Sequence, residues 1–310
     1  MVYTVHGFNF LCNTRINKYC EYIMGYAGNN LPTVRIIKAD NSNINMPENV
    51  EISNDFCTSK HSAEKSYFQF VNGNSILITH DEIRFGGNID EKLIGGPDII
   101  ILSRLHNRAV LHGSAFSYHD KAYLVCACPG AGKSTLSAAM TKYHKDIAVL
   151  TDDIISIDNS GISVFKGLPH VSLNKDSCDQ LFADADSSTI VSSNSDKSTI
   201  RVGISNITAP VQNYKIGGVF FLYPPLTDKL MEIQKYNSVE FFCEALKNIK
   251  FRRSLVEQTL SQEMKIIHNM VSLAPFGVKL RIKHDYSKLQ EITGRIVDYI
   301  ETEKQNESER

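Results

Sequence analysis

Residues 126–135 read CACPGAGKST, and this stretch decides which fold is expected. An apolar run at 122–127 precedes it and a helix-prone run at 136–140 follows it, so the order strand, glycine-rich loop, helix is predicted. Small residues let backbone N–H groups close around an anion, and the start of a helix adds a favourable dipole. The stretch therefore predicts a phosphate-binding loop made of Gly130, Ala131, Gly132, Lys133, Ser134 and Thr135.

Within this loop Lys133 supplies positive charge, and the hydroxyl of Ser134 can hold magnesium. Ala127 stands where the common G-x-x-x-x-G-K-[ST] pattern has its first glycine. The alternative interpretation is a tight glycine turn between a strand and a helix.

The second element is the pair Asp152-Asp153, which follows Lys133 by 19 and 20 residues. One helix and one turn fit into that distance, so the pair is expected at the end of the next strand, beside the loop. One carboxylate can then meet a metal while the other accepts the proton of a nucleophile. The alternative is an acidic pair that starts a turn or caps a hairpin.

Net charge, cysteine content and the length of apolar runs argue against three classes of protein: nucleic-acid-binding, disulfide-rich and membrane-spanning proteins. With 33 basic and 34 acidic residues the net charge is −1, so a role in nucleic-acid binding is not expected. The seven scattered cysteines suit reduced thiols, and Cys126 and Cys128 are expected to pack in a strand rather than to bind metal. No apolar run approaches the length of a membrane span and no leader is apparent, so a cytoplasmic location is expected.

The pattern of the chain predicts an α/β protein in two parts, a small β-rich N-terminal domain at 1–97 and a second domain at 98–310. Strands are expected at 2–11, 33–37, 50–52, 67–71, 75–79, 109–116, 122–127, 147–151, 217–222 and 277–282, with a hairpin at 154–165. Helices are expected at 99–105, 134–144, 175–182, 238–247, 253–273 and 286–301, with a fraying tail after them. The serine-rich segment 183–199 is expected to be a mobile loop or disordered.

Leu111-His112-Gly113, on the strand before the phosphate loop, is the third element. A lone histidine is usually structural, but the succession His112-Gly113, CPGAGKST and Thr151-Asp152-Asp153 resembles the catalytic domains of HPr kinase/phosphorylase and related kinases. Residues 95–115, 167–169 and 279–300 extend the resemblance to about two-thirds of the chain.

The resemblance implies a phosphate-loop kinase core similar to that of ATP-dependent phosphoenolpyruvate carboxykinase, preceded by the small β domain of HPr kinase-related proteins. It implies ATP and Mg²⁺ as cofactors, Lys133 on the β- and γ-phosphates, and Ser134 and Asp153 on the metal. It also implies Asp152 as acceptor of a serine proton and His112 near the transferred phosphoryl group. Phosphoryl transfer needs these parts: positioning, charge neutralisation and a proton acceptor.

The acceptor is the least determined part of the prediction. The glycine-rich glutamate signature of the bifunctional enzymes does not follow the Asp pair, so neither a phosphorylase activity nor HPr as the substrate is implied. A serine kinase acting on a peptide or small protein is expected, by analogy including the terminal serine of a lasso-type precursor peptide. A kinase of free serine or a related small molecule, and a catalytically silent nucleotide-binding regulator, are the alternatives. Related kinases can form rings, which leaves a homo-oligomer open.

Three further side chains are candidate contacts for substrate or phosphate. Lys197 and Arg201 lie in the polar segment and in the strand after it, and His170 follows Gly167-Leu168-Pro169. Solvated surface charge is the simpler interpretation of Lys197 and Arg201.

Overall fold

We analysed a computed structural model, which describes residues 2–12, 31–39, 51–53, 57–87, 96–128, 130–168, 170–183, 190–193, 197–201, 213–224, 229–251 and 257–309. For residues 2, 3, 51–53, 190–193, 197–201, 257 and 258 it describes the backbone alone. Contacts between Cα atoms group the chain into two units, one of residues 1–110, 156–159 and 249–266, the other of 111–155, 160–248 and 267–310. Such a grouping does not show which parts fold independently, so the boundary expected between residues 97 and 98 stays a prediction.

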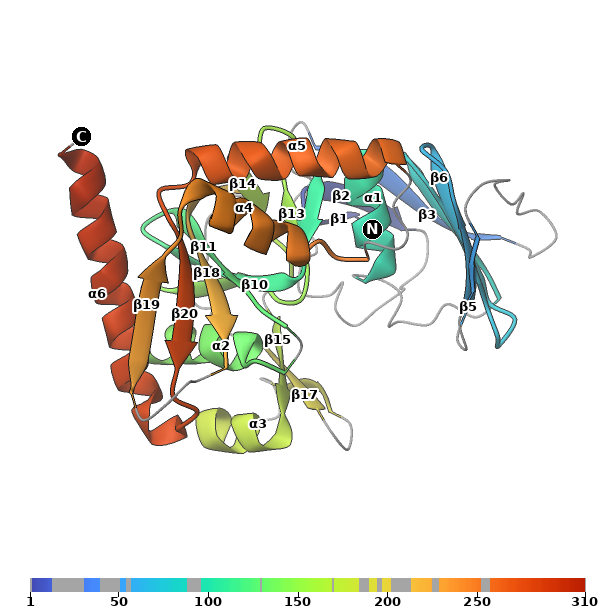
Figure 1. The fold of residues 1–310 in the computed structure, drawn as a ribbon. Helices are drawn as coiled ribbons and strands as arrows, with labels where there is room; N and C mark the ends of the chain where they lie inside the picture. The colour runs from blue at the N-terminus through green and yellow to red at the C-terminus, as the bar shows by residue number, and fades with distance from the viewer. Residues whose placement is uncertain are drawn as a thin grey trace. The chain divides into compact units, whose positions relative to one another are not determined.

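The first unit is built around an eight-stranded sheet with the order β1-β2-β3-β8-β7-β6-β5-β4 (Figure 1). Its strands are β1 (Val2–Val5), β2 (Phe8–Cys12), β3 (Thr33–Ala39), β4 (Glu51–Ser53), β5 (Cys57–His61), β6 (Lys65–Phe70), β7 (Ser75–Thr79) and β8 (Glu82–Gly86). β3 pairs in parallel with both β2 and β8, and the remaining pairs are antiparallel. Along the first part of β3, exposed and buried side chains alternate. This period of two is expected for a strand that packs on a core with one face only.

Helix α1 (Pro97–Leu105) belongs to the same unit. Pro97 stands in its first turn, where the missing N–H costs nothing, and the carboxylate of Asp98 accepts a hydrogen bond from the N–H of Gly96. Its apolar residues 99–102 are all buried. The short strand β9 (Ala109–Leu111) follows the helix.

Two buried histidines in this unit predict how stability depends on pH. Burial, with a smaller contribution from the charge of Arg108, lowers the pKa of His6 to about 3. Burial, helped by the charge of Arg104, lowers the pKa of His61 to about 4, and both ring nitrogens of His61 hydrogen-bond to serine hydroxyls. Both rings are therefore neutral in the folded chain at pH values where the unfolded chain, with a histidine pKa near 6.5, takes up protons.

The free energy of unfolding should therefore be fully present above about pH 6.5 and fall below it, by about 1.4 kcal/mol per pH unit for each histidine down to the folded pKa. Urea denaturation at pH 7 and pH 5 measures this slope. His61→Gln should flatten it, because the variant has no imidazole at this buried position to take up a proton. An unchanged slope in His61→Gln would contradict the assignment.

The second unit contains a mixed sheet in which β11 (Lys121–Cys126), β18 (Asn213–Tyr223) and β20 (Gly277–Ile282) are parallel neighbours. Antiparallel strands flank them: β10 (Gly113–Tyr118) and β12 (Ala148–Thr151) beyond β11, β14 (Ser163–Phe165) on the first part of β18, and β19 (Met231–Lys235) on β20. Strand β13 (Ile155–Ile157) precedes β14. Because parallel strands end at one edge of a sheet, the segments after β11, β18 and β20 emerge together.

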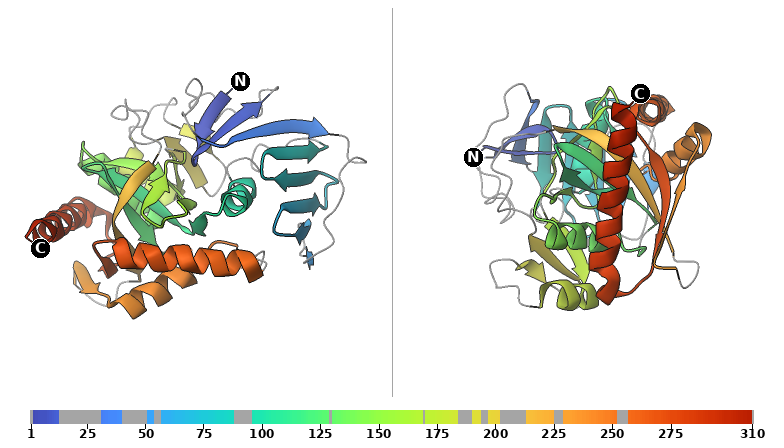
Figure 2. Two further views of the ribbon diagram at one scale, coloured as in Figure 1. Left: turned by 90° about the horizontal axis from the view of Figure 1, so that it is seen from above. Right: turned by 90° about the vertical axis from the view of Figure 1, so that its left-hand side faces the viewer.

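Helices cover both faces of this sheet (Figure 2). α2 (Lys133–Tyr143) and α6 (Leu289–Ser308) pack on one face through a core that includes Leu136, Met140, Ile292, Ile296 and Ile300. On the other face α4 (Ser238–Lys247) brings the ring of Phe241 against Gly277, where a Cβ atom would lie 2.5 Å from that ring. α5 (Glu257–Leu273) leads into β20.

A three-stranded sheet with the order β15-β17-β16 adjoins α3 (Lys175–Phe182). It consists of β15 (His170–Asn174), β16 (Ile190–Ser193) and β17 (Lys197–Arg201). A core cluster joins α2, α3 and β15 through side chains that include Ala138, Ala139, Val171, Leu173 and Leu181. This small sheet therefore holds the start of α3 beside the start of α2.

The mixed α/β class is confirmed, and several segments correct the expectation. Residues 190–193 and 197–201 are strands although the serine-rich segment 183–199 was expected to be a mobile loop or disordered; residues 184–189 and 194–196 lie outside the described ones. The many serines make both segments polar, so the few β-branched residues in them did not indicate a strand. The expected strands 2–11 and 109–116 are each two strands, and β5, β8 and β19 were not expected because polar residues interrupt their apolar pattern. The fraying tail is helical to Ser308.

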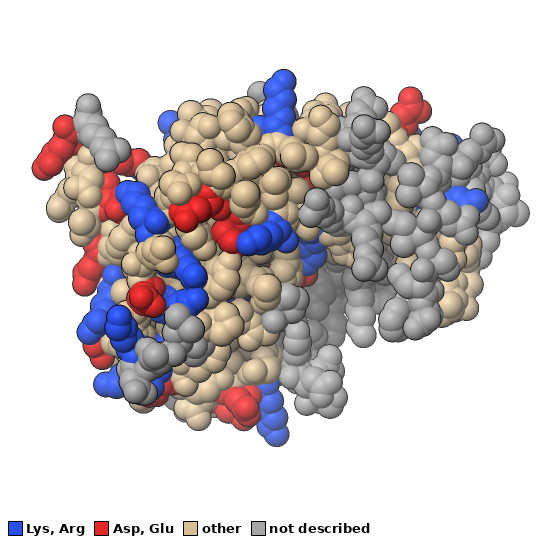
Figure 3. Space-filling view, in the orientation of Figure 1, with Lys and Arg blue, Asp and Glu red and all other residues tan. Residues whose placement is uncertain are grey.

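Charges of both signs are mixed over the part of the second unit that Figure 3 shows, without a broad patch of one sign. Among the described residues, none of the helices combines the length and the apolar character that crossing a bilayer requires.

Candidate functional site

A pocket of about 440 Å³ lies where the parallel strands β11 and β20 end. Open α/β sheets commonly bind ligands at this edge. The lining residues come from five stretches, and they are His112, Gly130–Leu136, Asp152, Asp153, Ser172, Asn174, Ser177, Ile282–Tyr286 and Leu289. The structure thus brings the three elements of the sequence prediction into one pocket.

The loop between β11 and α2 has the backbone that an anion site requires. Gly130 and Gly132 have φ values of +83° and +95°, a region that glycine enters without strain. No side chain among the described residues caps the start of α2, and the residues of its first turn line the pocket, the arrangement that an anion site at a helix start uses. The ammonium group of Lys133 donates to the carbonyl oxygens of Ala127 (3.1 Å) and Cys128 (3.4 Å), which holds it over the loop.

Asp152 is held by both of its carboxylate oxygens. The hydroxyl of Ser134 donates to Oδ1 over 3.0 Å, and the backbone N–H of Ser172 donates to Oδ2 over 3.0 Å. Burial raises the pKa of Asp152 above its usual range, while the hydrogen bonds from Ser172 and Ser134 act in the opposite direction. Asp152 and Ser134 therefore form one fixed oxygen pair at the start of α2.

Asp153 points elsewhere, toward His112. Its Oδ1 lies 3.1 Å from Nδ1 of His112, and its side chain is 63% exposed whereas that of His112 is 24% exposed. The backbone of Asp153 has φ +73°, the left-handed region that Asp and Asn tolerate better than most residues. The turn at Asp153 thus separates the directions of two adjacent carboxylates.

Gly113 explains why glycine follows His112. A Cβ atom at this position would lie 2.6 Å from Cδ1 of Ile155 and 2.7 Å from the carbonyl oxygen of Val125. The backbone N–H of His112 donates to the carbonyl oxygen of Asn248 over 2.7 Å. The close contact at Gly113 and the hydrogen bond from the His112 N–H fix the backbone on both sides of His112. Together they set the position of its imidazole ring.

Sequence reasoning missed the opposite wall of the pocket. The hydroxyl of Thr135 hydrogen-bonds to that of Ser177 (3.0 Å), which in turn hydrogen-bonds to that of Tyr286 (2.9 Å). Asn174 caps α3 by accepting the N–H of Ser177. The N-cap pattern at Asn174 could have been found in the sequence, but nothing local signals that residues 282–289 would reach the loop.

The three remaining candidates lie on the small sheet. His170 is buried at the start of β15, and it is not among the residues that line the pocket. In backbone register Arg201 lies opposite His170, and Lys197 lies opposite Asn174 of the pocket wall. The side chains of Lys197 and Arg201 fall outside the described part of the structure, so their roles stay predictions.

The donor set fits a magnesium ion that arrives with a nucleotide. Mg²⁺ prefers hard oxygen ligands and is usually bound by one or two protein groups, phosphates and water. Ser134 and Asp152 supply such oxygens beside the loop. Among the described residues, no group of three His, Cys, Asp or Glu side chains could hold a metal by itself.

Comparison with known proteins shows a distant likeness in fold. No protein-family model matches the chain, and the search of curated proteins gives no match. Among solved structures the chain is similar to the HPr(Ser) kinase/phosphatase from Coxiella burnetii, with 11% identity and a TM-score of 0.34 over 64% of this chain and 95% of that one. A likeness of this degree does not show the activity of this chain.

Proposed function

We propose that the chain is an ATP- and Mg²⁺-dependent kinase that transfers the γ-phosphoryl group to a serine hydroxyl of a peptide or small protein. The observation that carries the proposal is the meeting, in one pocket, of the glycine loop with Lys133, the Ser134–Asp152 pair and the His112–Asp153 pair. Each pair suits a separate requirement of phosphoryl transfer: metal binding and proton acceptance.

The contacts favour an exchange of the two aspartate roles relative to the sequence-based assignment. Ser134 and Asp152 would hold Mg²⁺, because their oxygens are 3.0 Å apart and Asp152 is fixed by Ser172. The bound ion would neutralise charge on the phosphates. Asp153, exposed and paired with His112, would accept the proton of the serine hydroxyl.

The proposed transfer forms one bond and breaks one. The serine oxygen forms a bond to the γ-phosphorus, the bond from that phosphorus to the bridging oxygen breaks, and ADP leaves. The serine proton passes to Asp153. Lys133 and the N–H groups at the start of α2 hold the phosphates, and positioning of this kind is the main source of rate in phosphoryl transfer.

Incubation with γ-labelled ATP and a set of serine peptides tests the proposal, since label should appear on a peptide only with Mg²⁺ present. Nucleotide binding has its own readout: the exposed thiol of Cys128 in the loop should be alkylated more slowly when Mg²⁺ and ATP are added. The exposed thiol of Cys243 is the internal control and should react at an unchanged rate. Cys126 should not react, because burial raises the pKa of its thiol to about 12.

The outcomes separate the candidate functions. Protection of Cys128 with transfer to free serine but to no peptide would favour a small-molecule kinase. Protection without transfer to any acceptor, including the true partner, would favour a nucleotide-binding regulator. Equal alkylation of Cys128 with and without ATP would contradict nucleotide binding altogether. A lasso-type precursor peptide ending in serine belongs in the peptide set, and a homo-oligomer is tested by its mass in solution.

A further inference from the structure

The pocket has two walls that diverge from the first turn of α2. Ser134 contacts Asp152, whereas Thr135 contacts Ser177, and through it Tyr286. Successive residues of a helix project about 100° apart, so the two contacts lead in different directions. One wall carries the proposed metal and proton acceptor, and the other is the segment that joins β20 to α6.

This second wall extends the pocket well beyond the phosphate loop. β20 is separated from β11 by β18, and neighbouring strands lie about 4.8 Å apart, so the two strand ends are roughly 10 Å from one another. In Figure 1 the end of β20 lies close to α2 and α3. A group held by the loop alone would leave the part of the pocket at residues 282–289 unfilled.

The chemistry of the wall suits a flat heterocycle joined to a sugar. Ile282, Leu289 and the ring of Tyr286 provide apolar surface, while Lys283, His284 and Asp285 add polar groups at its edge. Binding sites for small ligands typically combine apolar walls with a few polar groups in this way.

Asp285 in particular is fixed and charged. Its Oδ1 accepts the N–H (3.1 Å) and the hydroxyl (2.7 Å) of Ser287. The hydrogen bond from that hydroxyl is the main reason that the pKa of Asp285 is lowered. A carboxylate at this edge can accept hydrogen bonds from sugar hydroxyls or from an exocyclic amine.

We propose that the nucleoside half of the phosphoryl donor binds against the segment Ile282–Leu289, with the ring of Tyr286 as its main apolar contact. The inference rests on the proposed function and adds the donor's orientation to it. The acceptor does not compete for this wall, because it must reach the terminal phosphate beside Asp153, on the other side of α2.

The test compares two ligands that share phosphates but differ in the nucleoside: Mg²⁺-ATP and Mg²⁺-tripolyphosphate, both measured by calorimetry. Tyr286→Ala should weaken ATP binding by roughly 5- to 100-fold, the loss expected when a base no longer stacks on an aromatic ring. The same variant should leave tripolyphosphate affinity within about twofold. Tyr286→Phe keeps the ring and should retain most of the ATP affinity, although it loses the hydrogen bond to Ser177.

A folding control and a second wall variant complete the comparison. Tyr118→Ala removes another partly buried tyrosine of the same unit, outside the pocket, and should change neither affinity. His284→Ala removes an exposed side chain of the wall and should weaken ATP alone, by a smaller factor than Tyr286→Ala. Photolabelling with 8-azido-ATP should place the adduct in the tryptic peptide of residues 284–288.

Three outcomes overturn the inference: Tyr286→Ala weakens both ligands equally, it weakens neither, or the azido label lies outside residues 282–289. The proposed function fails in a different way: the wild-type chain would then bind neither Mg²⁺-ATP nor Mg²⁺-tripolyphosphate, or it would bind Mg²⁺-ATP without transferring phosphate to any acceptor.

Discussion

Replacing Asp153 by Asn is expected to slow phosphoryl transfer by roughly 10²- to 10⁴-fold, the usual contribution of a general base, while MgATP affinity is unchanged. Asp153 is the carboxylate that is exposed next to His112, whereas both oxygens of Asp152 are already engaged by Ser134 and Ser172. Asn also tolerates the left-handed backbone of this position, φ +73°, so the fold should persist. Single-turnover rates and calorimetric affinities measure the two quantities separately.

Asp152→Asn is the matched variant and should behave differently. It removes a charged oxygen next to Ser134, so the gain in ATP affinity on adding Mg²⁺ should largely disappear. The opposite result, with Asp152→Asn losing transfer but keeping Mg²⁺-dependent binding and Asp153→Asn staying active, would restore the assignment made from sequence. Comparable rates in both variants and the wild type would exclude either residue as the base.

Replacing Arg104 by Met is expected to lower the free energy of unfolding by about 3–5 kcal/mol, the cost of leaving a buried charge without its partner. Nε of Arg104 lies 2.9 Å from Oε1 of Glu263, and the two side chains are 4% and 1% exposed. The guanidinium group also donates to the carbonyl oxygens of Lys250 and Phe251. Burial raises the pKa of Glu263 above its usual range, opposed by the charge of Arg104, which agrees with a site that tolerates the carboxylate only when it is paired.

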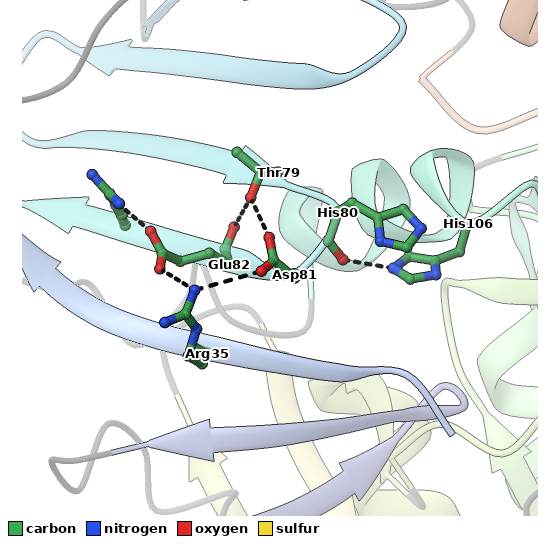
Figure 4. A network of polar contacts seen from close by, with 7 residues as sticks. Arg35, Thr79, His80, Asp81, Glu82 and His106 are labelled. Atoms are coloured by element: carbon green, nitrogen blue, oxygen red, sulfur yellow. Dashed lines mark hydrogen bonds and ion pairs between the residues drawn. The ribbon is translucent and has the colours of Figure 1, made fainter. Parts of the chain in front are cut away.

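An ion pair of the same unit whose arginine is exposed is the control for this measurement. Arg35 contacts Asp81 (3.5 Å) and Glu82 (3.1 Å), and its side chain is 56% exposed (Figure 4). Its buried partner Glu82 keeps its contact with Arg84 when Arg35 is removed. Arg35→Ala should cost about 1 kcal/mol or less. The double variant Arg104→Met, Glu263→Leu should recover part of the stability lost in Arg104→Met, because no charge is then left buried. A loss in Arg104→Met no larger than that in Arg35→Ala would show that the pair is solvated.

The sequence alone was sufficient for elements whose pattern is local. The apolar run before the glycines and the helix-prone run after Ser134 predicted the order strand, loop and helix. Helices at 175–182 and 238–247 and the strand at 277–282 agree with the structure residue for residue, since caps and apolar periodicity mark their ends. The joint presence of His112, the loop and the Asp pair was also visible in the chain.

Tertiary structure decided how those residues face one another. Asp152 and Asp153 are adjacent in sequence, yet the left-handed turn at Asp153 sends one carboxylate to Ser134 and the other to His112. No sequence pattern gives the direction of a side chain after such a turn. Residues 282–289 join the pocket because β20 pairs in parallel with β18, which brings Tyr286 to the partner of Thr135 although the two residues stand 151 positions apart in the chain. Strand order is set by packing over the whole sheet, which no local sequence pattern records. The sequence by itself therefore determined the chemistry of the phosphate loop, and the tertiary structure determined which residues lie opposite that loop.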